Sequence, residues 1–151
     1  MNLIEHFING KITKGSSKKK SKVFDPATGV QTSEVSLASK DDVDLAVEKA
    51  KQAFGMWSIR PPAQRARVIF KFKELIEKHA DEITKLIVSE HGKVYEDAKG
   101  SLTRGLEVVE FACGIPHLLK GEFTENVGTD VDSWSIRQPL GVCAGITPFN
   151  F

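Results

Sequence analysis

Apolar and polar positions recur with a helical period through the middle of the chain. Ser39 followed by Asp42 is a variant of the capping box that begins a helix, and the apolar positions after it predict a helix to about Trp57. Further helices are predicted from RPPAQ to His79, over 81–90 with a stop at His91-Gly92, and over 94–113. The centre of the chain is therefore expected to be a helical layer.

Shorter apolar pieces on either side of this layer predict strands. Before residue 39 they lie around Phe7-Ile8, Val23-Phe24 and Val35–Leu37, with turn signals between them, which predicts two or three short antiparallel strands. After residue 120, two extended runs about Gly128–Asp130 predict an exposed hairpin. Because a two-stranded hairpin buries its own apolar side chains poorly, we expect a subunit or domain contact there.

The last apolar run, GVCAGI at Gly141–Ile146, has the pattern of a strand buried on both faces of a parallel sheet. A parallel neighbour returns through a crossover unit of roughly 30 residues, whereas five residues follow Ile146. The run is then either the tail of a small domain that docks on a partner or part of the front portion of a longer chain. The second alternative explains the pattern better, and we expect it.

Composition and charge indicate an ordinary globular protein, with 40% hydrophobic and 27% charged residues. With 21 Lys and Arg against 20 Asp and Glu, the net charge does not indicate nucleic acid or an anionic membrane as a partner. The tract KGSSKKKSK at Lys14–Lys22 would be a nucleic-acid or localisation patch if taken alone, but a charge run at a hairpin tip is more often a solvated loop. We find no signal or transit pattern and no run of ~20 apolar residues, so we expect a cytoplasmic protein.

Chemistry that can be argued from the residues alone is sparse. Cys113 and Cys143 are too few for a disulfide framework or a zinc site, and both are expected to be small buried hydrophobic residues. The four histidines lack metal-ligand spacing, and GxSxG, P-loop and GxGxxG motifs are absent. What remains is ITPFN at Ile146–Asn150, which would place an Asn amide at the carboxyl edge of a parallel sheet, where ligands bind in open α/β folds. A plain strand-to-loop turn is the alternative.

Four motifs, in order along the chain, resemble the NAD-dependent aldehyde dehydrogenase superfamily. They are FINGK, DPATG, SEHGK and QPLGVCAGITPFNF, the last being similar to PxGVxxxIxPWNFP. Phe149 in place of the more common Trp, together with RGLEVVEFACG at Arg104–Gly114, is similar to the methylmalonate-semialdehyde dehydrogenase branch, whose members acylate coenzyme A.

The resemblance implies an α/β fold, namely the N-terminal part of an aldehyde dehydrogenase fold. Residues 1–120 would be the N-terminal part of the NAD-binding domain, with short strands and the helical layer. Residues 121–139 would be an oligomerisation hairpin, and 140–151 the first strand and loop of a Rossmann-type NAD-binding sheet, with the catalytic domain absent. The family's catalytic Cys belongs to a downstream motif that neither Cys113 nor Cys143 matches.

The resemblance also implies roles for individual residues. Asn150 matches the catalytic Asn whose amide donates to the substrate oxygen, a role that suits a neutral donor held in place before charge develops. Arg104 matches the position that presents a guanidinium to the substrate carboxylate, which it can bind through two parallel hydrogen bonds. An ion pair within its helix, with Glu107 or on the side of Asp97, is the alternative for Arg104. The positions that match loop contacts to the nicotinamide end of NAD are Thr147 and Phe149.

The implied function is that of an N-terminal segment of an NAD-dependent dehydrogenase that oxidises a (methyl)malonate-type semialdehyde to an acyl-CoA, inactive by itself. Coenzyme A would be a co-substrate, and no metal is implied. The alternatives are a hydrolytic semialdehyde or other aldehyde dehydrogenase, and a non-catalytic oligomerisation module of the family. The expected partners are the small semialdehyde and further copies in a homo-oligomer, either a dimer or a tetramer, with neither nucleic acid nor membrane.

Overall fold

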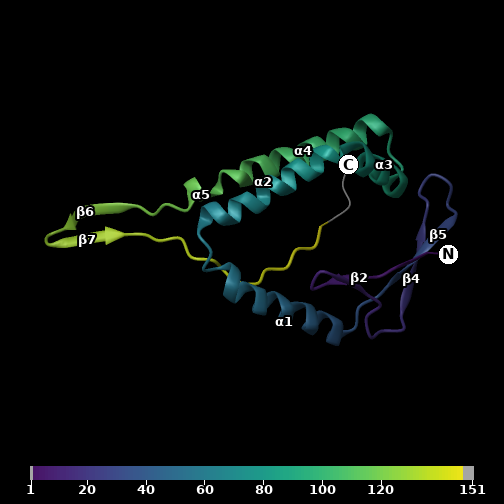
Figure 1. The fold of residues 1–151 in the computed structure, drawn as a ribbon, viewed down its shortest axis with the longest axis horizontal. Helices are drawn as coiled ribbons and strands as arrows, with labels where there is room; N and C mark the ends of the chain where they lie inside the picture. Colours follow the sequence, from purple (N-terminus) through teal and green to yellow (C-terminus); the bar gives the residue numbers. More distant parts are fainter. Residues whose placement is uncertain (1, 148–151) are drawn as a thin grey trace.

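The computed structural model describes residues 2–147 of the chain, which form short strands at the N-terminus, a helical layer and a distal hairpin (Figure 1). The N-terminal strands are β1 (Asn2–Ile4), β2 (His6–Ile8), β3 (Lys11–Thr13), β4 (Lys20–Phe24) and β5 (Gln31–Ser36). The helices are α1 (Lys40–Trp57), α2 (Pro62–Lys78), α3 (Ala80–His91), α4 (Tyr95–Cys113) and α5 (Ile115–Leu118). The distal hairpin consists of β6 (Phe123–Gly128) and β7 (Val131–Trp134).

The N-terminal strands form two small sheets, which differs from the expected set of two or three antiparallel strands. β2 and β3 form an antiparallel hairpin, whereas β5 lies in a separate sheet between β4 and β1 and is parallel to β1. The β4–β5 connection is fixed by Asp25, whose carboxylate accepts a 2.7 Å hydrogen bond from the Ala27 amide while its carbonyl accepts from the Gly29 amide at 2.8 Å. The expectation failed because the parallel partner, β1, is separated from β5 in the sequence by the β2–β3 hairpin and by β4.

The basic run Lys14–Lys22 does not lie at the tip of a hairpin, where it was expected. Its first part connects β3 of one sheet to β4 of the other, and Lys20 and Lys22 lie within β4 itself. This run therefore links the two sheets.

The helices begin and end close to their predicted positions. The capping box of α1 is formed: the Ser39 side chain accepts from the Asp42 amide, and the Asp42 carboxylate accepts from the Ser39 amide. Pro62 begins α2, where its missing N–H costs no helical hydrogen bond. Gly92 ends α3 in the left-handed conformation, with φ 79°, and its α-carbon faces Pro26 so closely that an added Cβ would lie 3.0 Å from the proline Cγ. Local periodicity and capping are sufficient to position these helices.

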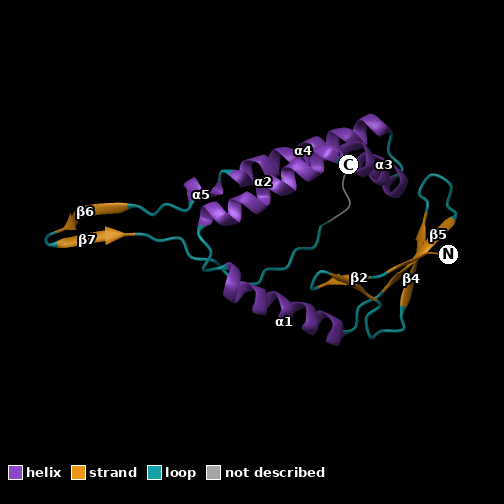
Figure 2. Ribbon diagram, in the orientation of Figure 1, coloured by secondary structure: helices purple, strands orange, loops and turns teal. Residues whose placement is uncertain are grey.

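Small side chains lie where the helices α2, α3 and α4 approach one another. The buried residues of this layer are Ala66 in α2, Thr84 in α3, and Ala98 and Cys113 in α4. The Tyr95 hydroxyl at the start of α4 donates to Asp81 at the start of α3 over 2.8 Å, and Lys85 pairs with the same carboxylate at 2.7 Å. The Tyr95–Asp81 hydrogen bond thus joins the start of α4 to the start of α3 in the layer that Figure 2 shows. Cys113 is buried, as predicted.

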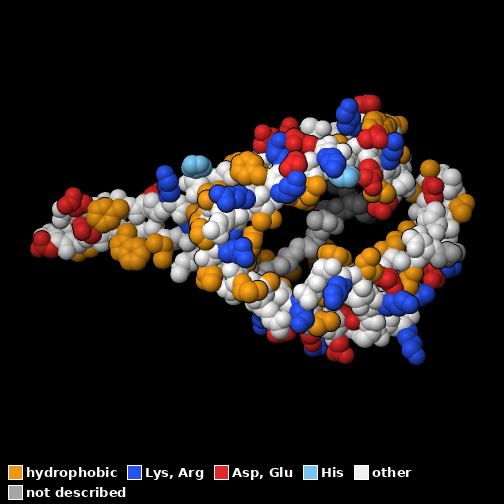
Figure 3. All heavy atoms as spheres, in the orientation of Figure 1, with side chains coloured by type: hydrophobic (Ala, Val, Ile, Leu, Met, Phe, Trp, Pro, Cys, Tyr) orange, Lys and Arg blue, Asp and Glu red, His pale blue; other side chains and the backbone are white. Residues whose placement is uncertain are grey.

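The chain as a whole is open. Helix α1 stands apart from the α2–α4 layer, and Figure 3 shows an opening between them with apolar side chains along part of its edge. The accessible surface is 12215 Å², compared with about 7,600 Å² for a compact monomer of this mass. The hairpin β6–β7 projects from the end of the molecule opposite to the N-terminal strands. Its apolar side chains are exposed, as expected, and Trp134 is 68% accessible. Large apolar faces of these elements are thus left uncovered within the described residues.

Asp42 joins the start of α1 to the link between the two sheets. Its carboxylate accepts hydrogen bonds from the backbone amides of Ser39 and Ser16, each at 2.8 Å, and from the Ser39 hydroxyl at 2.9 Å. These donors, the Ser39 amide first, lower the pKa of Asp42 from 3.8 to about 2. A carboxylate whose pKa is lower in the folded state stabilises the fold above its unfolded pKa, and that stabilisation is lost as the pH falls through the range from about 4 to about 2.

We therefore expect Asp42→Asn to lower the melting temperature most at about pH 6, where the wild-type carboxylate is charged. The Asn side chain presents one acceptor oxygen instead of two, so at least one of the two amides loses its partner. The difference between variant and wild type should narrow as the pH is lowered below about 4, which thermal unfolding followed by circular dichroism can measure. A difference that stays constant with pH would show that the carboxylate charge is not involved.

Candidate functional site

Arg104 lies near the middle of α4 with its side chain exposed. In the part of the chain that the structure describes, it forms no ion pair or hydrogen bond, so the alternative of a pair with Glu107 or on the Asp97 side is not observed. A guanidinium with all its donors available can bind a carboxylate in the bidentate geometry.

A cavity of about 220 Å³ runs along the face of α4 that carries Arg104. It is lined by Lys93, Glu96, Asp97, Gly100, Ser101 and Arg104. The Lys93 ammonium donates to the Ser101 hydroxyl over 2.9 Å, and this hydroxyl donates to the Asp97 carbonyl at 3.1 Å. Lys93 and Ser101 were not predicted as site residues. The spacing of 97, 101 and 104 along one helical face is the signal that could have identified this surface.

The charges in this cavity are separated along the helix axis. Glu96 and Asp97 lie in the first turn of α4, where carboxylates interact favourably with the helix dipole. Arg104 lies seven residues after Asp97, about 10 Å further along the helix. An anionic ligand would therefore bind at the Arg104 end of the cavity.

The run predicted as a buried strand, Gly141–Ile146, does not form one in the described residues. It has no regular secondary structure, Ile146 is 100% exposed, and Cys143 is exposed where the sequence predicted a buried residue. The reason is physical: a strand of a parallel sheet requires hydrogen-bonded neighbours, and none of the described strands pairs with this segment.

The other predicted site residues lie beyond this run. Thr147 is exposed and does not line the Arg104 cavity. Phe149 and Asn150 lie outside the described residues, so their roles stay predictions. The structure thus brings Arg104 together with Lys93 and Ser101, and does not bring Thr147 to them.

No group of His, Cys, Asp and Glu within residues 2–147 could hold a metal ion. Within the same residues, no helix is long and apolar enough to span a bilayer.

Comparison with known proteins places these features in a family. The model of the aldehyde dehydrogenase family matches residues 12–151. The chain belongs to the aldehyde dehydrogenase family. The N-terminal strands, helical layer and hairpin are accordingly those of an aldehyde dehydrogenase fold, as the motifs implied.

Individual aldehyde dehydrogenases resemble the chain along its whole length. A malonate-semialdehyde dehydrogenase of Pseudomonas aeruginosa is 47% identical over 151 residues, which is 100% of this chain and 30% of that protein. A mitochondrial acylating methylmalonate-semialdehyde dehydrogenase of Arabidopsis thaliana is 45% identical over 98% of this chain and 24% of its own length. A crystal structure from Sinorhizobium meliloti, assigned as a methylmalonate-semialdehyde dehydrogenase complexed with NAD, has a TM-score of 0.93 and 50% identity over 100% of this chain and 31% of that one. The chain therefore spans about a third or less of the length of these relatives.

A dinucleotide does not fit the described residues of this chain alone. Thr147, the described position that matches a nicotinamide contact, is open to solvent, and Leu140 at the start of the same segment is 96% exposed. Small-molecule sites enclose most of the ligand surface between protein walls, which a single unpaired segment cannot do.

We expect the 151-residue chain by itself to bind NAD too weakly for detection by titration calorimetry, and to oxidise no aldehyde. It carries no cysteine that matches the catalytic position, and within residues 2–147 no strand pairs with the segment that ends at Thr147. Calorimetry and NADH absorbance would test both parts. Turnover by the purified chain would contradict the assignment of the site residues.

Proposed function

We propose that this chain forms the Arg104-bearing part of an NAD-dependent dehydrogenase that oxidises a malonate-type semialdehyde and transfers the acyl group to coenzyme A. The observation that carries the proposal is the 47% identity with a malonate-semialdehyde dehydrogenase over all 151 residues. Support for coenzyme A comes from the acylating relative, and support for NAD from the complexed structure.

Arg104 would determine the substrate class. A malonate-type semialdehyde carries a carboxylate at one end and the aldehyde at the other, and the unpaired guanidinium can hold the carboxylate through two hydrogen bonds. Lys93 is held by the Ser101 hydroxyl in the same cavity and adds a second positive charge. By holding the carboxylate at one end of the substrate, this arrangement would orient the aldehyde at the other end.

Asn150 would act on the aldehyde oxygen. When a cysteine thiolate elsewhere in the enzyme adds to the carbonyl carbon, the oxygen becomes negative, and an Asn amide can donate a hydrogen bond to it. The oxygen would lose this charge as the thioester forms, an oxidation for which bound NAD would supply the hydride acceptor. It becomes negative again when the thiolate of coenzyme A attacks that thioester and displaces the cysteine. The same hydrogen bond from Asn150 would thus stabilise the negative oxygen in both thiolate additions.

The hairpin β6–β7 would join subunits of a homo-oligomer, a dimer or a tetramer. Its support is the row of exposed apolar side chains on β6 and β7, two strands that among the described residues pair only with each other.

A chimera tests the proposed function. The 151 residues replace the matching segment of the Pseudomonas aeruginosa malonate-semialdehyde dehydrogenase, and NADH formation is followed with malonate semialdehyde and with propanal, each with and without coenzyme A. We expect turnover that requires coenzyme A and prefers the carboxylated substrate by at least about tenfold. A folded chimera that used both aldehydes equally well would contradict the proposed substrate class.

A further inference from the structure

The positive charge of the chain is concentrated in one short segment. Residues 11–22 contain six of the 21 Lys and Arg and none of the 20 Asp and Glu, so the rest of the chain has a net charge of −5. The net charge of the whole chain is near zero, so no anionic partner was expected from it. This total conceals the separation of the basic segment from the acidic remainder. A segment of this kind attracts anionic surfaces over about a Debye length, about 8–10 Å at physiological salt.

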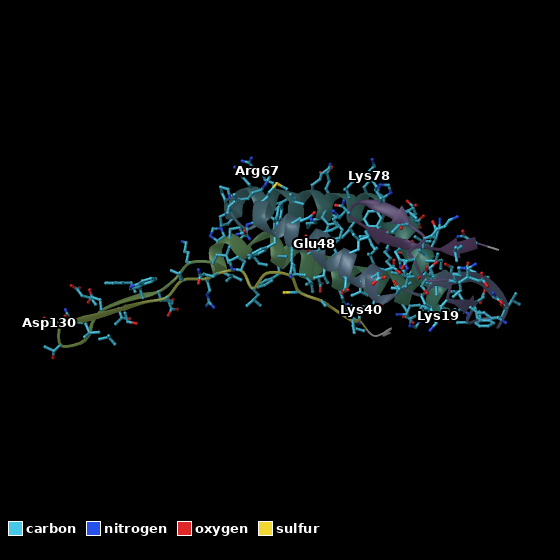
Figure 4. The ribbon with its side chains drawn as sticks, turned by 90° about the horizontal axis from the view of Figure 1, so that it is seen from below. Lys19, Lys40, Glu48, Arg67, Lys78 and Asp130 are labelled. Carbon is cyan, nitrogen blue, oxygen red and sulfur yellow. The ribbon has the colours of Figure 1, made fainter. Side chains whose placement is uncertain are left out.

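The lysines of this segment, which we call the lysine tract, are exposed and mostly unpaired. All six have exposed side chains, and Lys20 pairs with Glu34 at 3.1 Å. Among the described residues, no ion pair is formed by the other members, Lys11, Lys14, Lys18, Lys19 and Lys22. Figure 4 shows Lys19 along the same long edge of the molecule as Lys40, whose charge is paired with Asp44.

The backbone of the tract is held in place, which distinguishes it from a loose solvated loop. The Ser16 amide donates to the buried Asp42 carboxylate at 2.8 Å, and the Ser16 and Ser39 hydroxyls lie 2.7 Å apart. Further along, the Leu37 amide donates to the Lys19 carbonyl at 3.0 Å. The lysines are thus displayed by a segment anchored to α1 and to β5, so binding through them requires little ordering of the backbone.

Two large apolar side chains lie next to the lysines of the tract. Phe7 in β2 and Ile12 in β3 are directly opposite each other in the hairpin, and they are 74% and 73% exposed. Ile12 lies between Lys11 and Lys14 in the sequence. In amphipathic helices that lie on membranes, apolar side chains beside lysines are buried shallowly at the headgroup boundary, and the same pairing of residue types occurs on this hairpin.

We propose that the lysine tract, with Phe7 and Ile12, binds the surface of an anionic phospholipid membrane. The charged residues of the tract are all lysines, which act as point charges toward a diffuse anionic surface. Arginine forks and aromatic side chains within the basic run, which favour nucleic acid, are absent from residues 11–22. The association is peripheral and independent of the proposed catalytic function.

Vesicle sedimentation tests the proposal with the 151-residue chain. Binding is measured to phosphatidylcholine vesicles with and without phosphatidylserine, at low and at high salt, and to the polynucleotide poly(U). The tract variant changes four unpaired lysines to glutamine: Lys14, Lys18, Lys19 and Lys22. The matched control removes the same charge from four exposed lysines elsewhere: Lys51, Lys78, Lys99 and Lys120.

We expect binding that requires phosphatidylserine, weakens with salt, and falls at least about tenfold in the tract variant but less than about twofold in the control. The double variant Phe7→Ser, Ile12→Ser should bind the same vesicles more weakly, and the salt dependence of its binding should be unchanged. Equal losses in the tract variant and the control would overturn the proposal, because total charge would then explain binding. Binding to neutral vesicles at the same affinity, or tighter binding to poly(U), would also overturn it.

Discussion

Replacing Asn150 by alanine in the chimera is expected to lower kcat by about 10²–10³, or roughly 2.7–4 kcal/mol of transition-state stabilisation. The expectation follows from the proposed contact between the Asn150 amide and the substrate oxygen. That oxygen is nearly neutral in the bound aldehyde and negative when the thiolate has added. A donor fixed in advance therefore stabilises the transition state more than the ground state.

The effect should appear mainly in kcat. Because the hydrogen bond strengthens as charge develops, KM should change less than kcat, and NAD affinity should change little. A different result is expected if Asn150 only holds the turn after Gly141–Ile146. In that case alanine would lower the melting temperature and weaken NAD binding, while the folded enzyme turned over nearly normally.

The matched control is Asn2→Ala, which removes the same group from an exposed position in β1. Steady-state kinetics, NAD titration and thermal unfolding of the two variants separate the alternatives. A near-wild-type kcat for a well-folded Asn150→Ala enzyme would contradict the catalytic role.

The helical layer was predictable because its determinants are local. The capping box at Ser39 and the apolar spacing of α2 to α4 depend on residues within a few turns of each other, so the sequence carries them without knowledge of the tertiary structure. The hairpin β6–β7 was predictable for the same reason, since its turn and its two extended runs are adjacent.

The errors arose where structure depends on distant partners. The parallel pairing of β1 with β5 joins residues about 30 positions apart, as for Asn2 and Ser33, and no local pattern specifies it. The run Gly141–Ile146 has the composition of a buried strand, but composition cannot provide the neighbours that bury it, so Cys143 is exposed.

The candidate site was predictable only in part. Arg104 was found through the resemblance, whereas the hydrogen bond between Lys93 and Ser101 depends on a residue before α4 whose side chain reaches forward along the first two turns of the helix. Side-chain contacts of this kind follow from the direction of the chain before the helix, which periodicity does not report.

Arg104→Leu in the chimera is expected to lower kcat/KM for malonate semialdehyde by one to two decades and to leave kcat/KM for propanal nearly unchanged. A charge-assisted hydrogen-bonded pair contributes roughly 1.5–3 kcal/mol, and propanal has no carboxylate that could lose it. The loss should lie mainly in KM if the carboxylate contact is the same in the ground and transition states.

Two variants make the test specific. Arg104→Lys keeps the charge but not the bidentate fork, so it should recover part of the loss and no more. Arg67→Leu removes an exposed arginine of α2 that lines a different cavity from Arg104 and should affect neither substrate. Since Arg104 forms no ion pair within the described residues, its replacement should leave the melting temperature within about 2 °C of wild type, as expected for an exposed surface position. Equal losses on both aldehydes, or a large drop in melting temperature, would show that Arg104 supports the structure of α4 and does not select the substrate.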